Sequence, residues 1–437
     1  MERRSLSMTM IPHGYKRSEV GIIPVNWKVG TLGEVNARFT KGYGISKADL
    51  SEGGIPCVRY AELYTIYGDM CVLTTPASTT LPASAKRFAQ KGDVIFACSG
   101  ETFEDIGRAL AYIGDSPIAV GGDTLIYSNH NFEPSFLGYL LNSRYVVRQK
   151  MANSVGTTIV HIREKQLAEL VVAYPEYEEQ RAIATALSDM DALIEAKRAL
   201  LEKKRAIKQG AMQELLAGKR RLPGFPVTPM QHTEIGDIPE DWEVKTLGRS
   251  ASIARGGSPR PIESYLTTSP EGVNWIKIGD VSPGAKYIED TEEKILSSGA
   301  KHSRKVKPGD LLLSNSMSYG RPYILSLEGC IHDGWLTIAD YDGDFHRDYL
   351  YYALGSSIVV SQYEGLAAGT GVKNLNKKIV AGVQVPCPRD FHEQEAIVSA
   401  LSDMDDELVS LERKIEKLVD LKEGMMQNLL TGRIRLV

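Results

Sequence analysis

The chain has 437 residues, with 51 Lys and Arg against 55 Asp and Glu, and a formal net charge of −4. Its 43% apolar and 24% charged residues are typical of a folded globular protein and exclude collagen-like, disordered and disulfide-stapled classes. At roughly 100–200 residues per domain, the length predicts two to four domains. The small net charge also argues against a protein that coats nucleic acid by bulk positive charge, so a nucleic-acid role would need local basic patches.

The sequence favours a cytoplasmic protein without a membrane partner. No apolar run approaches the ~20 residues that span a bilayer, and residues 1–10 lack the apolar core of a secretory signal. The five cysteines are scattered and form no CxxC pair, which is typical of reduced thiols. A thiol nucleophile among them stays open as a minor alternative.

Residues 1–175 are rich in Gly, Tyr, Val and Ile and predict a mixed α/β globule. Short β-like runs at residues 94–97 and 125–127 are bounded by Gly, Asp or Ser. A helical patch at residues 136–142 is expected to pack on the resulting sheet. Residues 219–388 repeat this pattern, with strands expected at 275–278 and 311–313 and a helix at 349–354.

A long helix is expected after each globule, over residues 176–218 and 389–437. In the second helix the apolar positions advance by alternating steps of four and three, which indicates a coiled-coil seam. Its members are Ile397, Leu401, Met404, Leu408, Leu411, Ile415, Leu418, Lys422, Met425 and Leu429. The same phase in the first helix gives Ile183, Leu187, Met190, Ile194, Lys197, Leu201, Lys204, Lys208, Ala211 and Leu215. We expect Leu193, Leu200 and Ile207 to widen this weaker seam.

The charges and ends of the two helices favour antiparallel pairing within the chain. The first helix carries a basic set that includes Lys204, Arg205 and Lys208, and the second an acidic set. Pro175 and Pro388 precede the helices, and Gly218 and Gly432 are expected to stop them. A Pro-rich connector over residues 220–230 marks the boundary between the halves.

The chain is an internal duplication. The run Gln180-Arg-Ala-Ile-Ala-Thr-Ala-Leu-Ser-Asp-Met-Asp191 aligns without gaps to Gln394-Glu-Ala-Ile-Val-Ser-Ala-Leu-Ser-Asp-Met-Asp405. The segment from Gly21 to Gly33, with its Ile-Pro-x-x-Trp motif, recurs from Gly236 to Gly248. Repetition of such long segments predicts two copies of one module-plus-helix unit, related by a pseudo-twofold axis.

No constellation of catalytic residues is evident. The chain has no GxxxxGK[ST] phosphate loop, GxGxxG, HExxH or GxSxG motif. Asp191 with Glu195 and Lys197 resembles the carboxylate set of Mg²⁺-dependent nucleases, but all three fall on one predicted helix. We therefore expect a non-catalytic chain with no catalytic, cofactor-binding or metal-binding residues, and keep the nuclease as a minor alternative.

Several short motifs occur in the same order in both halves of the chain. Together they resemble those of one family, the specificity (S, HsdS) subunit of type I restriction–modification enzymes. The residues that carry the likeness are the Ile-Pro-x-x-Trp openings, the Gly-Asp strands, the Gly-Thr elements at Gly156 and Gly369, and the Glu-Gln-x-Ala-Ile helix starts. The Leu-Leu-x-Gly helix ends complete the set. The likeness covers about residues 19–437.

This resemblance implies two target recognition domains, residues 1–175 and 219–388 with the linker, and two conserved helical regions, 176–218 and 389–437. Each domain would read half of a bipartite, asymmetric duplex DNA site, with the helices as a spacer. The partners would be double-stranded DNA and two methyltransferase subunits, with restriction subunits left open. S-adenosylmethionine, ATP and Mg²⁺ would act in those partners. The alternatives are a scaffold with paired ligand-binding domains and the specificity subunit of a related methyltransferase–nuclease system.

Candidate DNA contacts follow from side-chain chemistry. Arg reads guanine, Asn reads adenine, and both Arg and Lys bind phosphate, while loop glycine amides can approach phosphates. In the first domain the candidates are Lys41, Tyr43, Arg59, Ser99 and Arg108. In the second domain they are Arg255, Ser258, Arg260, Lys277, Asn315, Tyr319 and Arg321. Trp27 and Trp242 are expected to be core anchors.

Overall fold

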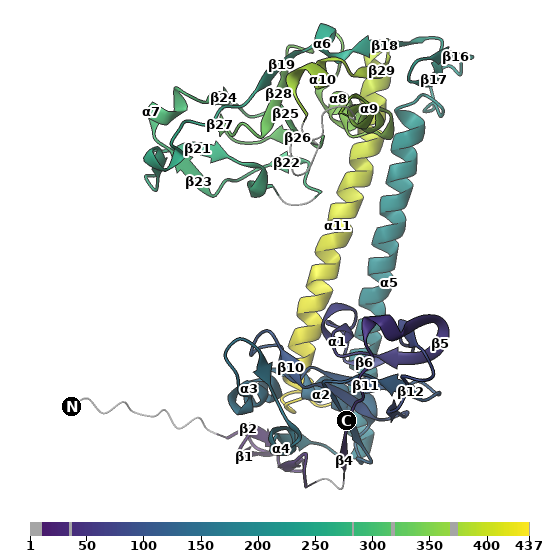
Figure 1. Ribbon diagram of the computed structural model, residues 1–437, viewed down its shortest axis with the longest axis vertical. Coiled ribbons are helices and arrows are strands. Elements are labelled where there is room, and N and C mark those ends of the chain that lie inside the picture. The colour runs from purple at the N-terminus through teal and green to yellow at the C-terminus, as the bar shows by residue number, and fades with distance from the viewer. Residues whose placement is uncertain (1–10, 35–36, 282–283, 316–319, 368–374, 437) are drawn as a thin grey trace, which may run out of the picture. The chain divides into compact units, whose positions relative to one another are not determined.

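The computed structural model (Figure 1) describes residues 11–34, 37–281, 284–315, 320–367 and 375–436. Two compact units divide the chain: unit 1 holds residues 1–199 and 413–437, and unit 2 holds residues 200–412. Each unit therefore contains one globular domain, the beginning of the helix that follows it and the end of the other long helix. We call the part of unit 1 before its long helix the first domain, and the part of unit 2 between the long helices the second domain.

The first domain is built on a five-stranded and a four-stranded sheet. The five-stranded sheet has the order β4 (Arg38–Lys41), β13 (Thr124–Ser128), β9 (Val94–Ala97), β11 (Ala109–Tyr112), β6 (Val72–Leu73). The four-stranded sheet has the order β7 (Ser78–Thr80), β5 (Leu50–Val58), β12 (Ile118–Val120), β8 (Phe88–Ala89). Two-stranded pairs join β1 (Tyr15–Ser18) to β2 (Gly21–Pro24), β3 (Lys28–Thr31) to β15 (Val171–Tyr174), and β10 (Ser99–Gly100) to β14 (Val160–His161). The helices are α1 (Glu62–Thr65), α2 (Pro134–Leu141), α3 (Arg144–Asn153) and α4 (Glu164–Ala168), with a 3₁₀ turn at Lys47–Asp49.

Alternation along β9 explains how the five-stranded sheet is covered on both faces. Val94 and Phe96 belong to the core that contains Phe136 of α2. Ile95 and Ala97 point the other way, into a core shared with the four-stranded sheet. Since successive strand residues face opposite sides, the fully apolar run of residues 94–97 is the pattern required of a strand buried on both faces.

The second domain repeats these sheets. Its first five-stranded sheet has the order β19 (Ser252–Arg255), β28 (Trp335–Ala339), β25 (Leu311–Ser314), β26 (Pro322–Leu325), β22 (Tyr287–Ile288). The second has the order β20 (Leu266–Thr267), β23 (Glu293–Ile295), β21 (Val273–Ile276), β27 (Gly329–Ile331), β24 (Arg304–Val306). The pairs are β16 (Met230–Thr233) with β17 (Gly236–Pro239) and β18 (Trp242–Thr246) with β29 (Gln384–Pro388). The helices are α6 (Leu247–Ser250), α7 (Ser297–Ala300), α8 (Arg347–Leu354), α9 (Ser357–Ala367) and α10 (Lys377–Ala381), with 3₁₀ turns at Ile262–Ser264 and Ile278–Asp280. The expected duplication and mixed α/β class are confirmed.

The two expected long helices are α5 (Tyr177–Leu215) and α11 (Phe391–Leu429), each of 39 residues. Within unit 1, Ile183 and Leu187 near the start of α5 share a core with Leu429 at the end of α11. Within unit 2, Leu215 at the end of α5 shares a core with Ile397 and Leu401 near the start of α11. The pairing is therefore antiparallel in each unit, as the sequence predicted.

The seam residues read from the heptads are buried or half-buried along both helices. The expected charge pairing is also present in unit 2, where Lys204 contacts Glu407 at 2.7 Å and Arg205 contacts Glu412 at 2.6 Å. The expected widening of the seam is wrong. Leu193, Leu200 and Ile207 are 41%, 36% and 48% exposed. Burial along the first helix is therefore concentrated on the seam positions themselves.

The ends of the long helices cross between the repeats. Gly432, which follows α11, packs on Pro24 and Trp27 of the first domain, and Gly218, which follows α5, packs on Pro239 and Trp242 of the second. Both glycines have positive φ, +67° and +66°, the backbone conformation that ends many helices. The Ile-Pro-x-x-Trp motif thus forms the surface on which a Leu-Leu-x-Gly helix end packs. Both tryptophans are 1% exposed, which confirms them as core anchors.

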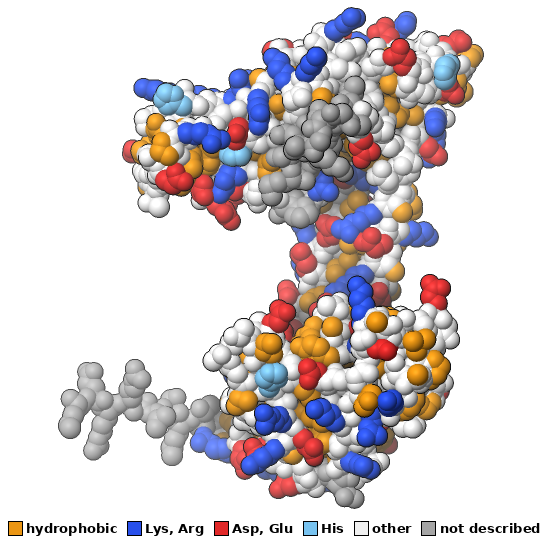
Figure 2. All heavy atoms as spheres, in the orientation of Figure 1, with side chains coloured by type: hydrophobic (Ala, Val, Ile, Leu, Met, Phe, Trp, Pro, Cys, Tyr) orange, Lys and Arg blue, Asp and Glu red, His pale blue; other side chains and the backbone are white. Residues whose placement is uncertain are grey.

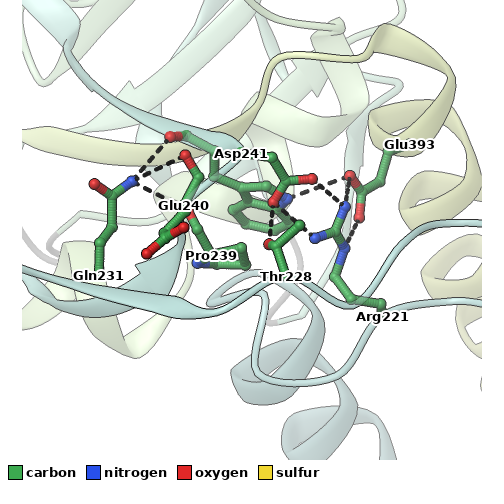
Figure 3. Close-up of polar contacts among 8 residues, drawn as sticks. Arg221, Thr228, Gln231, Pro239, Glu240, Asp241 and Glu393 are labelled. Atoms are coloured by element: carbon green, nitrogen blue, oxygen red, sulfur yellow. Dashed lines mark hydrogen bonds and ion pairs between the residues drawn. The ribbon is translucent and has the colours of Figure 1, made fainter.

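The connector between the repeats is fixed in place at Arg221, whose side chain is only 4% exposed (Figure 3). Its guanidinium donates to Glu393 at 2.7 Å and, through two nitrogens, to Asp241 at 3.0 Å. Although burial would lower it, these hydrogen bonds raise the pKa of Arg221. Thr228 also donates to Asp241 at 2.6 Å. Arg221 and its carboxylate partners therefore serve as a clamp that holds the connector on the start of α11.

In the part of the chain that the structure describes, neither the two long helices nor any shorter one carries an apolar stretch sufficient to cross a bilayer.

Candidate nucleic-acid interface

In both domains, loops from four strands meet at one edge, which we call the loop edge. In the first domain it comprises residues 41–44, 59–60, 98–99 and 121–123; in the second it comprises 255–261, 277, 315 and 332–334. Hydrogen bonds match the two edges: the amide of Tyr43 donates to Val120 at 3.0 Å, and that of Gly257 donates to Ile331 at 3.1 Å. The amide of Cys98 donates to Asp123, and that of Asn315 to Gly334, each at 2.9 Å. By these pairings and the strand registers, Lys41 corresponds to Arg255 and Arg59 to Lys277.

The glycine amides of these loops do not point outward. Gly256 donates to the carbonyl of Trp335 at 2.9 Å, and its first-domain counterpart Gly42 donates to that of Thr124 at 3.0 Å. A Cβ at Gly256 would lie 2.1 Å from the carbonyl oxygen of His332. Both glycines are thus needed for close backbone approach. The expectation that the amides at Gly256 and Gly257 approach phosphates is wrong, because strand pairing uses these donors.

Five side chains of the second domain converge on Asp333, in the turn between β27 and β28. Ser258 Oγ donates to Asp333 Oδ1 at 2.9 Å, Arg255 Nε donates to the Asp333 carbonyl at 2.8 Å, and Asn315 Nδ2 donates to the same carbonyl at 2.8 Å. Arg260 Nη2 lies 3.6 Å from Oδ2, and His332 Nε2 lies 2.9 Å from Oδ1. Burial would raise the pKa of Asp333, but the Ser258 hydrogen bond and the nearby positive charges lower it. The carboxylate is therefore ionised at neutral pH.

The other second-domain candidates differ in accessibility. Lys277 forms an ion pair with Glu293 at 2.8 Å, and its amide donates to Asp280. Ser258, Arg260, Lys277 and His332 line a cleft of about 750 Å³ with Trp275 in its wall. Asn315 is only 1% exposed, whereas Arg321 is exposed at the end of the same loop. Tyr319 lies outside the described residues.

The first-domain candidates are less clustered. Tyr43 is 47% exposed with Lys86 Nζ 4.5 Å from its ring centre, and Lys41 is exposed beside it. Arg59 is held by an ion pair to the buried Glu62 at 2.9 Å. Ser99 is 3% exposed, and its hydroxyl lies 2.9 Å from His161 Nδ1.

Arg108 is placed away from the first domain's loop edge. Its backbone carbonyl accepts from Ala97, as that of Arg321 accepts from Ser314, so the two arginines correspond. The Arg108 side chain, however, lines a cleft within unit 1 together with Asp191 of α5 and Lys422 of α11. It donates to the carbonyl of Met70 at 3.2 Å. The Arg108 side chain therefore lies beside the long helices and not among the other candidate DNA contacts.

Two further basic residues adjoin the loop edges and were missed from the sequence. Arg304 Nε donates to the Arg255 carbonyl at 2.7 Å. Arg87 occupies the matching position in the first domain, since β8 pairs with β12 as β24 pairs with β27. The signal was available: each arginine stands six residues before the aspartate of the Gly-Asp motif, in a basic pair with a neighbouring lysine. That motif itself is structural, because Asp93 and Asp310 cap the preceding turn.

Charge on the second domain is mixed rather than uniformly basic. The space-filling view shows Lys and Arg side chains interspersed with Asp and Glu over the region of β21, β23, β24 and β27 (Figure 2). Local ion pairs such as Lys277 with Glu293 account for part of this pattern. Such a surface binds a polyanion through individual Lys and Arg side chains at defined positions and not through a high net positive charge.

Comparison with known proteins agrees with the duplicated fold. The family model for the type I restriction modification DNA specificity domain matches residues 24–203 and again residues 239–420. The chain belongs to this family of type I restriction–modification specificity subunits.

Two specificity subunits match over most of their length. The MjaX type I restriction enzyme specificity subunit of Methanocaldococcus jannaschii is 28% identical over 434 residues, 96% of each chain. The EcoDI specificity subunit of Escherichia coli is 22% identical over 437 residues, 95% of this chain and 89% of its own. A chain solved in work on complex assembly and conformational transition of a type I R-M system has a TM-score of 0.59 at 20% identity, covering 94% of this chain and 99% of its own. The S subunit from M. genitalium has a TM-score of 0.53 at 17% identity, covering 92% and 96%.

Asp191, the first residue of the nuclease alternative, has structural partners, and so does its counterpart Asp405. Asp191 accepts from Tyr139 Oη at 2.7 Å and pairs with Lys422, and Asp405 accepts from Tyr352 Oη at 2.6 Å and pairs with Lys208. Since both copies use this aspartate alike, it fastens the helix pair to the domain. Among the described residues, no group of three or more His, Cys, Asp or Glu side chains is arranged to hold a metal ion.

Burial also opposes a thiol nucleophile. Four of the five cysteines are buried, and Cys98 is half-buried. Loss of hydration raises the pKa of Cys57 to about 11 and that of Cys98 and Cys387 to about 12. Because the thiolate is the reactive form, these thiols are poor nucleophiles at neutral pH.

Proposed function

We propose that this chain is the DNA-reading, non-catalytic subunit of a type I restriction–modification system. Each domain reads one half of a bipartite, asymmetric duplex site through its loop edge, and the paired helices set the spacing. The observation that carries the proposal is the pair of loop edges: the backbone hydrogen bonds are the same, but the side chains differ. One edge offers Lys41 and Arg59 where the other offers Arg255 and Lys277.

A duplicated scaffold with diverged loop side chains suits two different half-sites. Phosphate contacts by Lys and Arg position a protein on DNA, while base contacts by Arg and Asn specify sequence. The helical segments fastened by Asp191 and Asp405 would present equivalent surfaces to two methyltransferase subunits. S-adenosylmethionine, ATP and Mg²⁺ would then be used in the partner subunits, in the cytoplasm.

The test is to purify the full chain alone and with its methyltransferase partners and to map methylated bases in substrate DNA. We expect methylation only from the complex, at one bipartite sequence, and DNA affinity that falls linearly on a logarithmic salt scale. Methylation by the isolated chain would overturn the non-catalytic role. A complex that binds no DNA at low salt would favour the scaffold alternative.

A further inference from the structure

The turn between β27 and β28 (residues 332–334) ties together most of the second domain's loop edge. Asp333 contacts Ser258 and Arg260 through its carboxylate, and Arg255 and Asn315 through its main-chain carbonyl. Its own amide also donates to Ser258 Oγ at 3.3 Å. Together with Asp333 itself, these residues come from three separate loops of the domain. A single turn therefore fixes the loops relative to each other.

The histidine beside it is oriented by contacts at both of its ring nitrogens. His332 Nδ1 accepts from the amide of Gly334 at 2.9 Å, so this nitrogen carries no proton. The other ring nitrogen, Nε2, lies 2.9 Å from Asp333 Oδ1. The Gly334 amide thus orients the ring, Nε2 lies beside Oδ1 of the carboxylate, and Oδ2 is the oxygen that faces Arg260.

A carboxylate at the centre of this cluster is unfavourable for plain phosphate binding. It would repel the DNA backbone and cancel part of the positive charge of Arg255 and Arg260. Asp333 does restrict the arginines. Its main-chain carbonyl binds Arg255 at Nε, and its carboxylate lies 3.6 Å from Arg260, whose side chain is 81% exposed. An arginine held in this way loses less side-chain entropy on binding and can present its outer nitrogens to a planar acceptor pair.

The first domain lacks this arrangement. Its turn at the same position reads Gly121-Gly122-Asp123, and the aspartate corresponds to Gly334, one residue later. Asp123 has φ +57° and is exposed, and Lys41 replaces Arg255. The two loop edges thus share a backbone but hold their cations differently.

We propose that Asp333 is the positioning residue for base readout by the second domain. It orients Arg255 and Arg260 toward the O6 and N7 acceptors of guanine in the major groove, the base edge that matches an arginine fork. This inference rests on the proposed function and assigns a guanine-containing half-site to the second domain.

The test uses the full chain assembled with its methyltransferase subunits and maps the methylated sequence for the wild type and for Asp333→Ala, Asp333→Asn, Arg260→Ala and Arg255→Ala. For Asp333→Ala we expect the half-site read by the first domain to stay unchanged. Discrimination for guanine at the position read by Arg260 in the other half-site should fall about tenfold to hundredfold, because the main-chain carbonyl that holds Arg255 remains. Arg260→Ala should lose guanine preference at the same position, and Arg255→Ala at a neighbouring one.

Asp333→Asn is the variant that keeps shape and the acceptor for Ser258 but removes the charge facing Arg260. It should relax the same position to a smaller extent, and it decides the question if Asp333→Ala fails to assemble. Asp342→Ala, at an exposed aspartate of the same domain, is the matched control and should leave the sequence unchanged.

The outcomes separate the inference from the function on which it rests. An unchanged sequence in both Asp333 variants, a change confined to the other half-site, or a second half-site without guanine would each overturn the inference alone. A wild-type complex that modifies DNA without sequence preference would overturn the proposed function.

Discussion

In both units an arginine that follows one long helix forms an ion pair with a glutamate at the start of the other, and this clamp is more buried in unit 2 than in unit 1. In unit 2, Arg221 is 4% exposed and lies between the carboxylates of Glu393 and Asp241. In unit 1, the equivalent Arg435 is 28% exposed and meets Glu179 and the amide oxygen of Asn26. Trp242 Nε1 donates to Glu393 at 3.2 Å, whereas Trp27 Nε1 is buried without a partner among the described residues.

This difference shows which parts of a duplicated unit can change independently. The tryptophan, the arginine and the glutamate of the clamp are present in both copies, because in each copy the end of a long helix must pack on the domain. The second acid is Asp241 in one copy and Asn26 in the other, and its charge is therefore an addition to the clamp. Removing one partner from a buried ion pair leaves an uncompensated charge, so the more buried clamp should be the more sensitive.

The largest effect is expected from Arg221→Met. The change leaves Glu393, whose side chain is 3% exposed, without its cation and should lower the free energy of unfolding by about 3–5 kcal/mol. Arg435→Met should cost less, about 1–2 kcal/mol, because its site is wetter and has one carboxylate. Urea unfolding of the chain measures both, with Arg413→Met on the exposed face of α11 as the control. Equal losses at the two sites would contradict the comparison.

A second pair of contacts should be equal in the two units. Tyr139→Phe removes the hydroxyl that donates to Asp191, and Tyr352→Phe removes the one that donates to Asp405. Each should cost about 1.5–3 kcal/mol, the usual range for a hydrogen bond to a charged group. Double-mutant cycles with Asp191→Asn and Asp405→Asn isolate the two bonds. Tyr177→Phe, at a half-exposed ring, should be neutral; a twofold difference between the two cycles would break the equivalence.

The last expected effect is a pH dependence confined to unit 1, and it is small for each step in pH. Lys150 is fully buried and donates to the Gly107 carbonyl at 2.7 Å, and burial lowers its pKa to about 7; the matching residue in unit 2 is Tyr363. Between pH 7 and about 10.5 this lysine is protonated in the unfolded chain and neutral in the folded one. The free energy of unfolding therefore rises with pH, by at most about 1.4 kcal/mol for each pH unit. Below pH 7 both states are protonated and the burial cost is fully present.

Lys150→Met removes this contribution. The wild type should therefore gain stability relative to the variant as pH rises from 7 to 10, measured from paired unfolding midpoints. Tyr363→Phe is the matched substitution in the other unit and should show no such trend over pH 7–9. A wild-type advantage that falls with rising pH would contradict the assignment.

Much of the architecture could be predicted because it is encoded in short or periodic patterns. The heptad steps from Ile397 to Leu429 required a helix with one apolar seam, and the identical Ala-Leu-Ser-Asp-Met-Asp runs required a duplication. Opposite charges such as Lys204 and Glu407 indicated that the helices pair. The prediction that Leu193, Leu200 and Ile207 widen the seam was wrong for a physical reason. The sequence shows that a side chain is apolar, but only the tertiary packing decides whether it is covered.

The loop edges depended on tertiary structure. Sequence alone determined that this chain is two copies of a domain followed by a helix, and it picked the basic loop at Arg255–Arg260. It did not determine that the amides of Gly256 and Gly257 are used in strand pairing, or that Arg304 adjoins Arg255. Nor did it single out Asp333, because the residues that meet there come from loops up to 78 positions apart along the chain. Contacts at that separation depend on strand order and register, which local patterns do not specify.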